Sequence, residues 1–433
     1  MTRVEILTRR ARRVVLWRCA VLWCCAVLVG CGGDHGGFDA GLDAARPDVV
    51  SIDGGVDAGA PTYPLDVPID VDPCPDEACT GGHDAQIHLV TASDGEGAWV
   101  AYSAVVAPRS TFDVFLAHVA RDGTVDLAPR QLSTTAGNHI DPEIALGASG
   151  QALVSWTVDD GSGGGSNLQI LRRLVRSDGT VVGSGDARLT TQWRGVDVTA
   201  NHVGFVVAHG PTGFAIAGVR GLPEATTFQV FAQALDEEGA LVGEALAPLL
   251  EPMVSQGPAA AAFTPAGLRV AYERGDASTE IVLAGAGLDA PVSITATGAS
   301  APGFVADATR ALVAYADGDD VRVIDVVDPA APRELAVLGM PGPDHSPRLV
   351  LDGGGGAALI WMHVLSGIRN QVWAARLDGT GAGEPRLLFD APGAPAYVPS
   401  IAHVEGDVFF VVWSEGERSP HFRGRGRYVE LLR

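Results

Sequence analysis

The side chains able to do chemistry are few and scattered. Six cysteines and eleven histidines occur in 433 residues, and no two histidines stand at an established metal-ligand spacing. The chain has no G-x-S-x-G nucleophile elbow, no H-E-x-x-H motif and no phosphate-binding P-loop. The glycine run 353–356 predicts a hairpin turn, and the acidic stretch 317–320 predicts a turn, with a surface cation site as the alternative. The sequence therefore predicts no metal, no cofactor and no identifiable catalytic residue.

The N-terminus has the pattern of an export signal. Arginines at positions 3, 9, 10, 12 and 13 precede an apolar stretch from Cys19 to Gly30. That stretch is too short for a membrane-spanning helix, which needs ~20 residues. Residues 1–30 are therefore interpreted as a signal peptide, with a retained anchor helix as the alternative.

The end of this stretch, Leu28-Val29-Gly30-Cys31, resembles the lipobox of bacterial lipoproteins. The resemblance implies that the Cys31 thiol carries diacylglycerol and that the chain is cut before it. Two or three acyl chains give stable membrane anchoring, whereas one is marginal. Gly32 stands where an aspartate would mark retention at the inner membrane, so the resemblance implies an outer-membrane lipoprotein of the cell envelope.

An acidic spacer is expected after the anchor. Residues 31–73 are rich in Asp, Gly, Ala and Pro and almost lack aromatics, which predicts a disordered tether. Residues 74–83 form a short segment with the remaining cysteines, Cys74 and Cys79. An oxidising compartment favours a disulfide between them, with free thiols or metal ligation as alternatives.

Composition excludes several classes of protein. Hydrophobic residues make up 47% of the chain and charged residues 19%, with 55 glycines and 27 prolines between apolar runs. This pattern indicates many strands and turns, not a coiled coil, a helical bundle or a polytopic membrane protein. The net charge of −22 would repel phosphate backbones, so no nucleic-acid partner is expected.

A repeat organises residues 84–433. A strand-like run of small, apolar and aromatic residues recurs seven times, at 98–102, 152–156, 204–208, 268–272, 311–315, 357–361 and 409–413. A proline precedes the terminal aromatic of five of these runs by 13 or 14 residues, at 142, 258, 302, 347 and 399. Because proline cannot donate to a ladder, each is expected at the first residue of a strand. Asp-Gly pairs at 122, 178 and 378 predict hairpin turns after the third strand of their units.

Seven units of about 50 residues, each with four short strands, predict an all-β fold: a β-propeller of about seven four-stranded blades. Tandem β-sandwich domains are the alternative. The units resemble propellers at large and match no particular propeller family. The S-x-D-x-G-x-x-W box of sialidase-like propellers is absent, because Ser93 to Trp99 has a different order, and this argues against a glycosidase by analogy.

Topology predicts where a binding site would lie. The loops between second and third strands, and between blades, share one face and are long and varied here. Candidate ligand contacts on that face are Arg109, His209, Phe214, His363, Arg369, Arg418 and His421.

The last unit has room for only three strands, at 399–403, 408–413 and 428–432. An unpaired edge is rarely left bare, so residues 87–91 or residues 63–71 are expected to pair with it.

The sequence favours a lipid-anchored envelope protein that binds a protein or carbohydrate ligand through its propeller, with the membrane as a second partner. The alternative is an envelope hydrolase or lyase that uses carboxylates on the loop-rich face.

Overall fold

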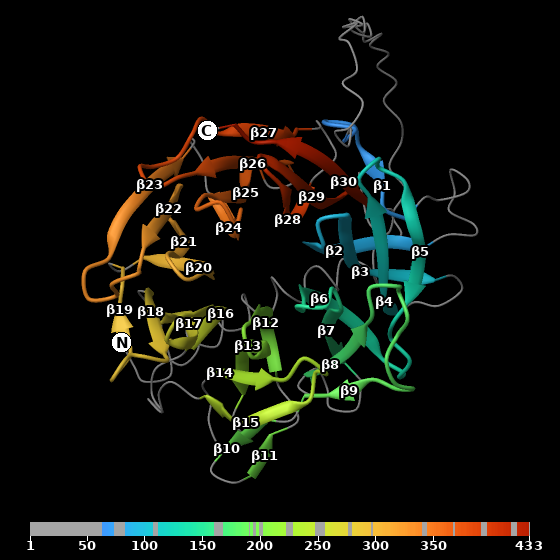
Figure 1. Ribbon diagram of the computed structural model, residues 1–433, viewed down its shortest axis with the longest axis horizontal. Helices are drawn as coiled ribbons and strands as arrows, with labels where there is room; N and C mark the ends of the chain where they lie inside the picture. The colour runs from blue at the N-terminus through green and yellow to red at the C-terminus, as the bar shows by residue number, and fades with distance from the viewer. Residues whose placement is uncertain are drawn as a thin grey trace, which may run out of the picture. The chain divides into compact units, whose positions relative to one another are not determined.

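Seven four-stranded antiparallel sheets form a ring (Figure 1). The computed structural model describes residues 63–72, 83–106, 111–159, 168–189, 191–193, 196–198, 202–221, 228–246, 256–275, 279–295, 298–339, 344–366, 369–390, 396–416 and 422–432. Each sheet packs against its two neighbours, and the innermost strands of adjacent sheets contact each other all the way round. The protein is therefore a seven-bladed β-propeller, as predicted, and the tandem-sandwich alternative is wrong.

The first four blades follow one another along the chain. Blade 1 contains β2 (His83–Ser93), β3 (Gly97–Val106), β4 (Phe112–Ala120) and β5 (Val125–Gln131). Blade 2 contains β6 (Asn138–Leu146), β7 (Ala152–Asp159), β8 (Leu168–Val175) and β9 (Ala187–Arg188). Blade 3 contains β12 (His202–Gly210), β13 (Gly213–Gly221), β14 (Phe228–Leu235) and β15 (Leu241–Leu246). Blade 4 contains β16 (Gln256–Thr264), β17 (Gly267–Arg274), β18 (Glu280–Gly285) and β19 (Val292–Ser293).

The remaining blades complete the ring. Blade 5 contains β20 (Ala299–Ala306), β21 (Ala311–Asp317), β22 (Asp320–Asp325) and β23 (Arg333–Gly339). Blade 6 contains β24 (Asp344–Leu351), β25 (Ala357–Ser366), β26 (Arg369–Leu377) and β27 (Arg386–Phe389). Blade 7 contains β28 (Ala396–Glu405), β29 (Val408–Glu415), β30 (Arg423–Glu430) and, from the other end of the chain, β1 (Ile69–Asp70). A separate hairpin pairs β10 (Thr191–Trp193) with β11 (Val196–Val198).

The recurring apolar runs are buried on both sides because each blade is covered by two others. In β3 and β7 nearly every residue is buried, whereas the outer strand β5 alternates between half-buried and exposed. Trp99 of blade 1 and Trp156 of blade 2 belong to one apolar cluster between the two sheets. Six of the seven predicted second strands are second strands in the structure, namely β3, β7, β17, β21, β25 and β29.

The prolines mark the innermost strands but do not begin them. Pro142, Pro302 and Pro347 lie inside β6, β20 and β24, where the pairing register shifts by one residue. The residues before them, Asp141, Ala301 and Ser346, have φ of 53°, 51° and 53°. A β-bulge tolerates a residue that cannot donate to the ladder, so the predicted position at the strand start was wrong while the choice of strand was right.

The third blade is where the repeat was misread. Residues 204–208, predicted as a second strand, belong to the innermost strand β12, and the second strand is β13. The register that pairs Val206 with Ala217 sets Phe205 opposite Gly218. In blades 2, 5, 6 and 7 the register places a proline of the first strand opposite an aromatic residue of the second, whereas blade 3 has its aromatic residue on the first strand. The third unit has neither the proline nor the terminal aromatic residue of the other runs, so its second strand was assigned from the apolar run alone.

This arrangement predicts a strict size limit at Gly218. A Cβ added there would lie 2.7 Å from the Cβ of Phe205, which cannot swing away. Gly218→Ala is therefore expected to destabilise the domain by about 1–3 kcal/mol through overpacking. Gly185→Ala is the matched control, because a Cβ at that exposed position meets no atom within 4 Å. Equal unfolding midpoints for the two variants in urea would contradict this assignment of the strands.

The predicted Asp-Gly hairpins join third and fourth strands. The carboxylates of Asp122, Asp178 and Asp378 each accept the backbone N–H two residues later, at 2.9, 2.8 and 2.6 Å. The glycines at 123 and 179 have φ of +84° and +79°, a conformation that a side chain would strain. These turns keep the blade ends short on one side of the ring.

The ring is closed by a strand from the N-terminal side. β1 pairs with β30, with Ile69 opposite Gly426 and Asp70 opposite Arg425. We call residues 63–72 the clasp, because they bridge the last blade and the first. The alternative pairing partner, residues 87–91, is instead part of β2 and pairs with β3. Residues 63–72, assigned to the tether from sequence, are thus part of the ring.

Side chains at the seam hold the clasp to both blades. The Tyr428 hydroxyl donates to the carbonyls of Val119 and Ala120 at 3.0 and 2.9 Å, and its ring lies 5.0 Å from that of Tyr63. The Tyr102 hydroxyl donates to Asp72 at 2.7 Å. Of three C-terminal side chains expected to be buried, Tyr428 and Leu431 are, whereas Leu432 is 65% exposed because the chain has left β30.

Candidate functional site

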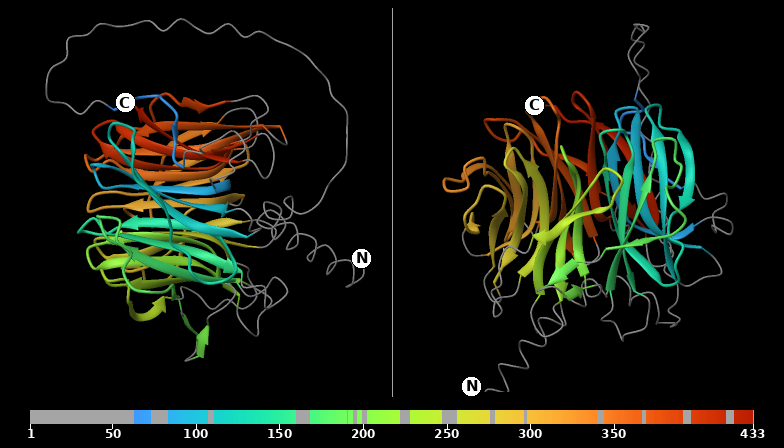
Figure 2. Two further views of the ribbon diagram at one scale, coloured as in Figure 1. Left: turned by 90° about the vertical axis from the view of Figure 1, so that its right-hand side faces the viewer. Right: turned by 60° about the horizontal axis from the view of Figure 1, so that its bottom comes forward.

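The ring has two unlike faces, seen from the side in Figure 2. We call the end with the first-to-second and third-to-fourth strand turns the turn face. The opposite end, where second strands lead to third strands and blades connect, is the loop face. In blade 6, for example, β24 and β26 begin at the loop face and end at the turn face.

Two predicted contacts lie at the loop-face end of blade 6. Arg369 begins β26, is 38% exposed and forms an ion pair with Asp390 at 2.7 Å. His363 is 1% exposed and its Nδ1 lies 2.7 Å from an oxygen of the buried Asp344. Arg369 is accessible to a ligand, whereas the His363–Asp344 pair ties two strands of the blade together. Whether either binds a ligand stays a prediction.

Two other predicted contacts lie at the opposite face. His209 pairs with Phe214 across the hairpin that joins β12 to β13, which is at the turn face. Phe214 is fully buried, and His209 Nε2 lies 2.8 Å from Glu237. Their expected position on the loop face was wrong because the second strand of blade 3 had been placed one strand too early.

The other site predictions lie outside the described residues. These are the ligand contacts Arg109, Arg418 and His421, the lipid-attachment residue Cys31 and the cysteine pair Cys74 and Cys79.

The innermost strands bring charged groups to the centre of the ring. Arg348 of blade 6 donates to Glu143 of blade 2 in two hydrogen bonds of 2.8 and 3.2 Å. These blades are not neighbours, so the pair spans the central channel. Burial disfavours the guanidinium charge, but the Glu143 carboxylate outweighs it and raises the pKa of Arg348. This pair obstructs the middle of the channel.

A histidine–carboxylate pair lies beside it. His88 Nδ1 is 2.7 Å from Asp141, with side chains 17% and 38% exposed. Both residues have positive φ, 54° and 53°, which is strained for residues with side chains. Burial opposes ionisation of Asp141, but the charge and hydrogen bond of His88 hold the pKa of that carboxyl below its usual value.

Blade 3, the neighbour of blade 2, has no side chain at the corresponding bulge. The equivalent bulge of blade 3 carries Gly204, and a Cβ there would meet nothing within 4 Å. In blade 4, Glu273 accepts the backbone N–H of Ala301 at 2.6 Å, and burial raises the pKa of this carboxyl. We call His88, Asp141, Glu143 and Arg348, which all lie on innermost strands, the channel cluster.

Sequence reasoning missed the channel cluster although a signal was present. Asp141 and Glu143 flank Pro142, and Arg348 follows Pro347. The prolines had already identified the innermost strands, so their charged neighbours were candidates for the channel wall. His88 has no proline beside it in the sequence.

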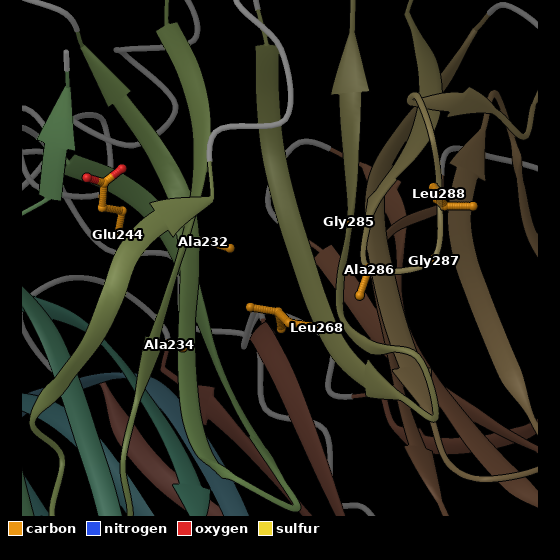
Figure 3. A pocket seen from close by; sticks show the side chains of 8 residues that line it. All are labelled: Ala232, Ala234, Glu244, Leu268, Gly285, Ala286, Gly287 and Leu288. Carbon is orange, nitrogen blue, oxygen red and sulfur yellow. The ribbon is translucent and has the colours of Figure 1, made fainter.

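A groove of about 460 Å³ lies elsewhere, between blades 3 and 4 (Figure 3). Its walls are Ala232, Ala234, Glu244, Leu268, Gly285, Ala286, Gly287 and Leu288. Leu268 points into it, while the carboxylate of Glu244 points away. The groove is lined mostly by small apolar residues, and Glu244 is the one titratable residue among those that line it.

Metal-binding groups and membrane-spanning helices were also sought in the described part of the chain. No three His, Cys, Asp or Glu side chains there are placed to hold a metal ion. Within the same residues, no helix has the length and apolar character needed to cross a membrane.

A buried histidine of blade 3 predicts loss of stability in acid. Burial, followed by the charge of Arg220, lowers the pKa of His202 to about 3. Between pH ~6.5 and about 3 the unfolded chain binds a proton there that the folded chain refuses. Stability is therefore complete above pH ~6.5 and falls with pH by up to about 1.4 kcal/mol per unit.

The expected result is that His202→Gln flattens the unfolding free energy over this pH window. His403→Gln, at a half-buried position near the turn face, serves as the control. The unfolding free energy is measured by urea denaturation at several pH values. If its dependence on pH were the same in His202→Gln as in the wild type, the assignment would be contradicted.

Comparison with known proteins identifies the fold. No protein-family profile and no curated protein sequence matches the chain. A protein of unknown function from Dyadobacter fermentans is 13% identical, with a TM-score of 0.51, covering 84% of this chain and 98% of its own. An ulvan lyase, described as a new family of polysaccharide lyase, is 10% identical, with a TM-score of 0.52, covering 79% and 93%.

A third structure is similar at a lower score. The β-propeller domain of the Trilobed protease from Pyrococcus furiosus is 10% identical, with a TM-score of 0.48, covering 81% of this chain and 98% of its own. At such identities the likenesses concern the fold alone.

Proposed function

We propose that the protein is a lipid-anchored binding protein of the bacterial cell envelope that meets a protein or carbohydrate ligand with its loop face. The observation that carries this proposal is the direction in which the clasp runs along the last blade. β30 runs from the loop face to the turn face and β1 is antiparallel to it, so Tyr63 lies at the turn face. Chain connectivity would therefore bring a tether from Cys31 to the ring at the end opposite the loop face.

The loop face offers the chemistry that a polar ligand needs. The channel cluster presents carboxylates, an imidazole and a guanidinium within a rigid ring. Since the Glu143–Arg348 pair obstructs the channel, a ligand would approach from one side. Lipid modification at Cys31 and location at the outer membrane rest on the lipobox resemblance and on Gly32.

Affinity capture from solubilised envelopes tests the proposal. Wild-type protein is expected to retain a discrete ligand, and the amount that Asp141→Asn captures is expected to be at least tenfold lower. Asp289→Asn removes an equivalent charge at the turn face and should capture as wild type does. Equal capture by both variants would contradict binding through the channel cluster.

A second candidate function is an envelope hydrolase. It is favoured by two carboxylates, on blades 4 and 2, whose pKa values are displaced in opposite directions, upward for Glu273 and downward for Asp141. Glu273 would donate the proton to a leaving group and Asp141 would accept the proton of the attacking water. New reducing ends in envelope polysaccharide, absent with Glu273→Gln, would favour this candidate. Capture of an intact ligand with no product would favour binding.

A further inference from the structure

The innermost strands share a repeated irregularity of the backbone. In blades 1, 2, 3, 5 and 6 one residue has a φ between 51° and 54° at the point where the pairing register shifts. These residues are His88, Asp141, Gly204, Ala301 and Ser346. Because the innermost strands all run from the loop face to the turn face, the five residues lie at one level of the central channel. We call this level the bulge layer.

The ion pair that spans the channel lies next to this layer. Glu143 and Arg348 each stand two residues nearer the turn face than Asp141 and Ser346, the bulge residues of their strands. Both oxygens of Glu143 accept hydrogen bonds from the Arg348 guanidinium, at 2.8 and 3.2 Å. The pair therefore obstructs the channel on the turn-face side of the bulge layer, so a ligand would reach the layer from the loop face.

The bulge layer has an open position beside Asp141. On one side, in blade 1, His88 Nδ1 lies 2.7 Å from Asp141. On the other side, blade 3 carries Gly204, which is exposed, and a Cβ there would meet no atom of a described residue within 4 Å. The side chain of His88 reaches Asp141 from the equivalent position of its blade, so a group seated at Gly204 would be within similar reach.

The remaining hydrogen-bonding capacity favours an uncharged ligand. The Asp141 side chain is 38% exposed, and one of its oxygens has no hydrogen-bond partner among the residues that the structure describes. Its other oxygen is held by His88, as Glu143 is held by Arg348. An anion would be repelled by both carboxylates, and a cation would compete with the groups that already bind them. A hydroxyl group can donate to the remaining Asp141 oxygen and leave both pairs intact.

We propose that the space at Gly204, beside Asp141, is a subsite for an uncharged sugar unit. The inference rests on the proposed function and narrows its ligand from protein or carbohydrate to uncharged carbohydrate. A hydroxyl of the sugar donates to Asp141, and the sugar ring fills the space that a side chain at position 204 would occupy.

Substitution at position 204 blocks this subsite without removing a charge. Asparagine tolerates the left-handed conformation, and His88 and Asp141 already carry side chains there. Gly204→Asn is therefore expected to fold as the wild type does. It should bind the sugar about 10-fold more weakly or less tightly still, the effect of losing a hydrogen bond to a charged group. Gly406→Asn is the matched control, because Gly406 has a φ of 52° and equal open space but lies in a turn at the turn face.

Isothermal titration calorimetry of the full-length protein with oligosaccharides tests the ligand class. Envelope polysaccharide is partially hydrolysed and separated by ion exchange into uncharged, acidic and basic pools. The uncharged pool is expected to bind the wild type and Gly406→Asn more tightly than either charged pool does, and to bind Gly204→Asn weakly. Circular dichroism checks that the variants are folded, and Gly204→Ala, with the smaller side chain, carries the test if Gly204→Asn is not.

Two results would overturn the inference: tighter binding of a charged pool, or equal binding of the uncharged pool by the Gly204 and Gly406 variants. If no pool binds while affinity capture retains a protein that Asp141→Asn loses, the subsite is refuted and the proposed function stands. Capture that Asp141→Asn leaves unchanged would refute both.

Discussion

A chain that ends after Arg425 is expected to lose the cooperative fold of the whole ring, not of one blade. The deletion removes Tyr428, which is buried against the clasp and blade 1, and Val429 and Leu431, which are buried between blades 7 and 6. Each large apolar side chain contributes about 1.5–3 kcal/mol on burial. Their sum is comparable to the total stability of a typical domain, about 5–15 kcal/mol.

Thermal unfolding followed by circular dichroism, with limited proteolysis, measures this loss. Removal of residues 432–433 alone is the matched control, because Leu432 is 65% exposed and lies beyond β30. The control should melt as wild type does. A stable proteolytic fragment covering the first blades of the longer truncation would show that the blades fold without closure.

Cys31→Ala is expected to release the protein from membranes and to block its normal processing. The resemblance of residues 28–31 to a lipobox makes this thiol the attachment point for the acyl chains. A fatty-acid analogue should label the wild type and a Cys74→Ala control but not Cys31→Ala. Absence of label in the wild type, or a Cys31→Ala protein that still sediments with membranes, would exclude lipid anchoring through Cys31.

The fold was predictable because the residues that recur in each unit are of types with a definite structural role. A proline removes a ladder donor and an aromatic fills the space between blades, so their spacing marks first and second strands. The second strand of blade 3 was not identified, because in this blade the aromatic residue, Phe205, is on the first strand and packs against Gly218 of the second. Spacing alone cannot assign the second strand of a unit that lacks both marker residues.

The clasp was predictable for a different reason. Three strands in the last unit leave an edge, and the strand-like residues 63–71 stand closest before the first blade. The sequence did not decide between these residues and residues 87–91, because both are apolar and alternate. The ion pair of 2.6 Å between Asp66 and Arg386, and the contact of Asp70 with Arg425, favour the first at the seam.

The channel cluster was less predictable because it depends on contacts between distant blades. Glu143 and Arg348 are separated by 205 residues, and only a closed ring with known blade order brings them together. His209 and Phe214 were expected on the loop face because residues 204–208 were assigned to the second strand of blade 3. They belong to the first strand, so both residues lie at the turn face. Site prediction in such a ring therefore depends on assigning every strand correctly.

Photo-crosslinking in intact envelopes tests the central claim, that the loop face of this ring meets the ligand, most directly. A photoreactive residue replaces Asp319, in the exposed turn between β21 and β22 at the loop face, or Asp289, in an exposed turn at the turn face. The account predicts a discrete adduct from position 319 that is lost when Asp141→Asn is added, and none from position 289. Adducts of equal yield from both positions, or from position 289 alone, would contradict it.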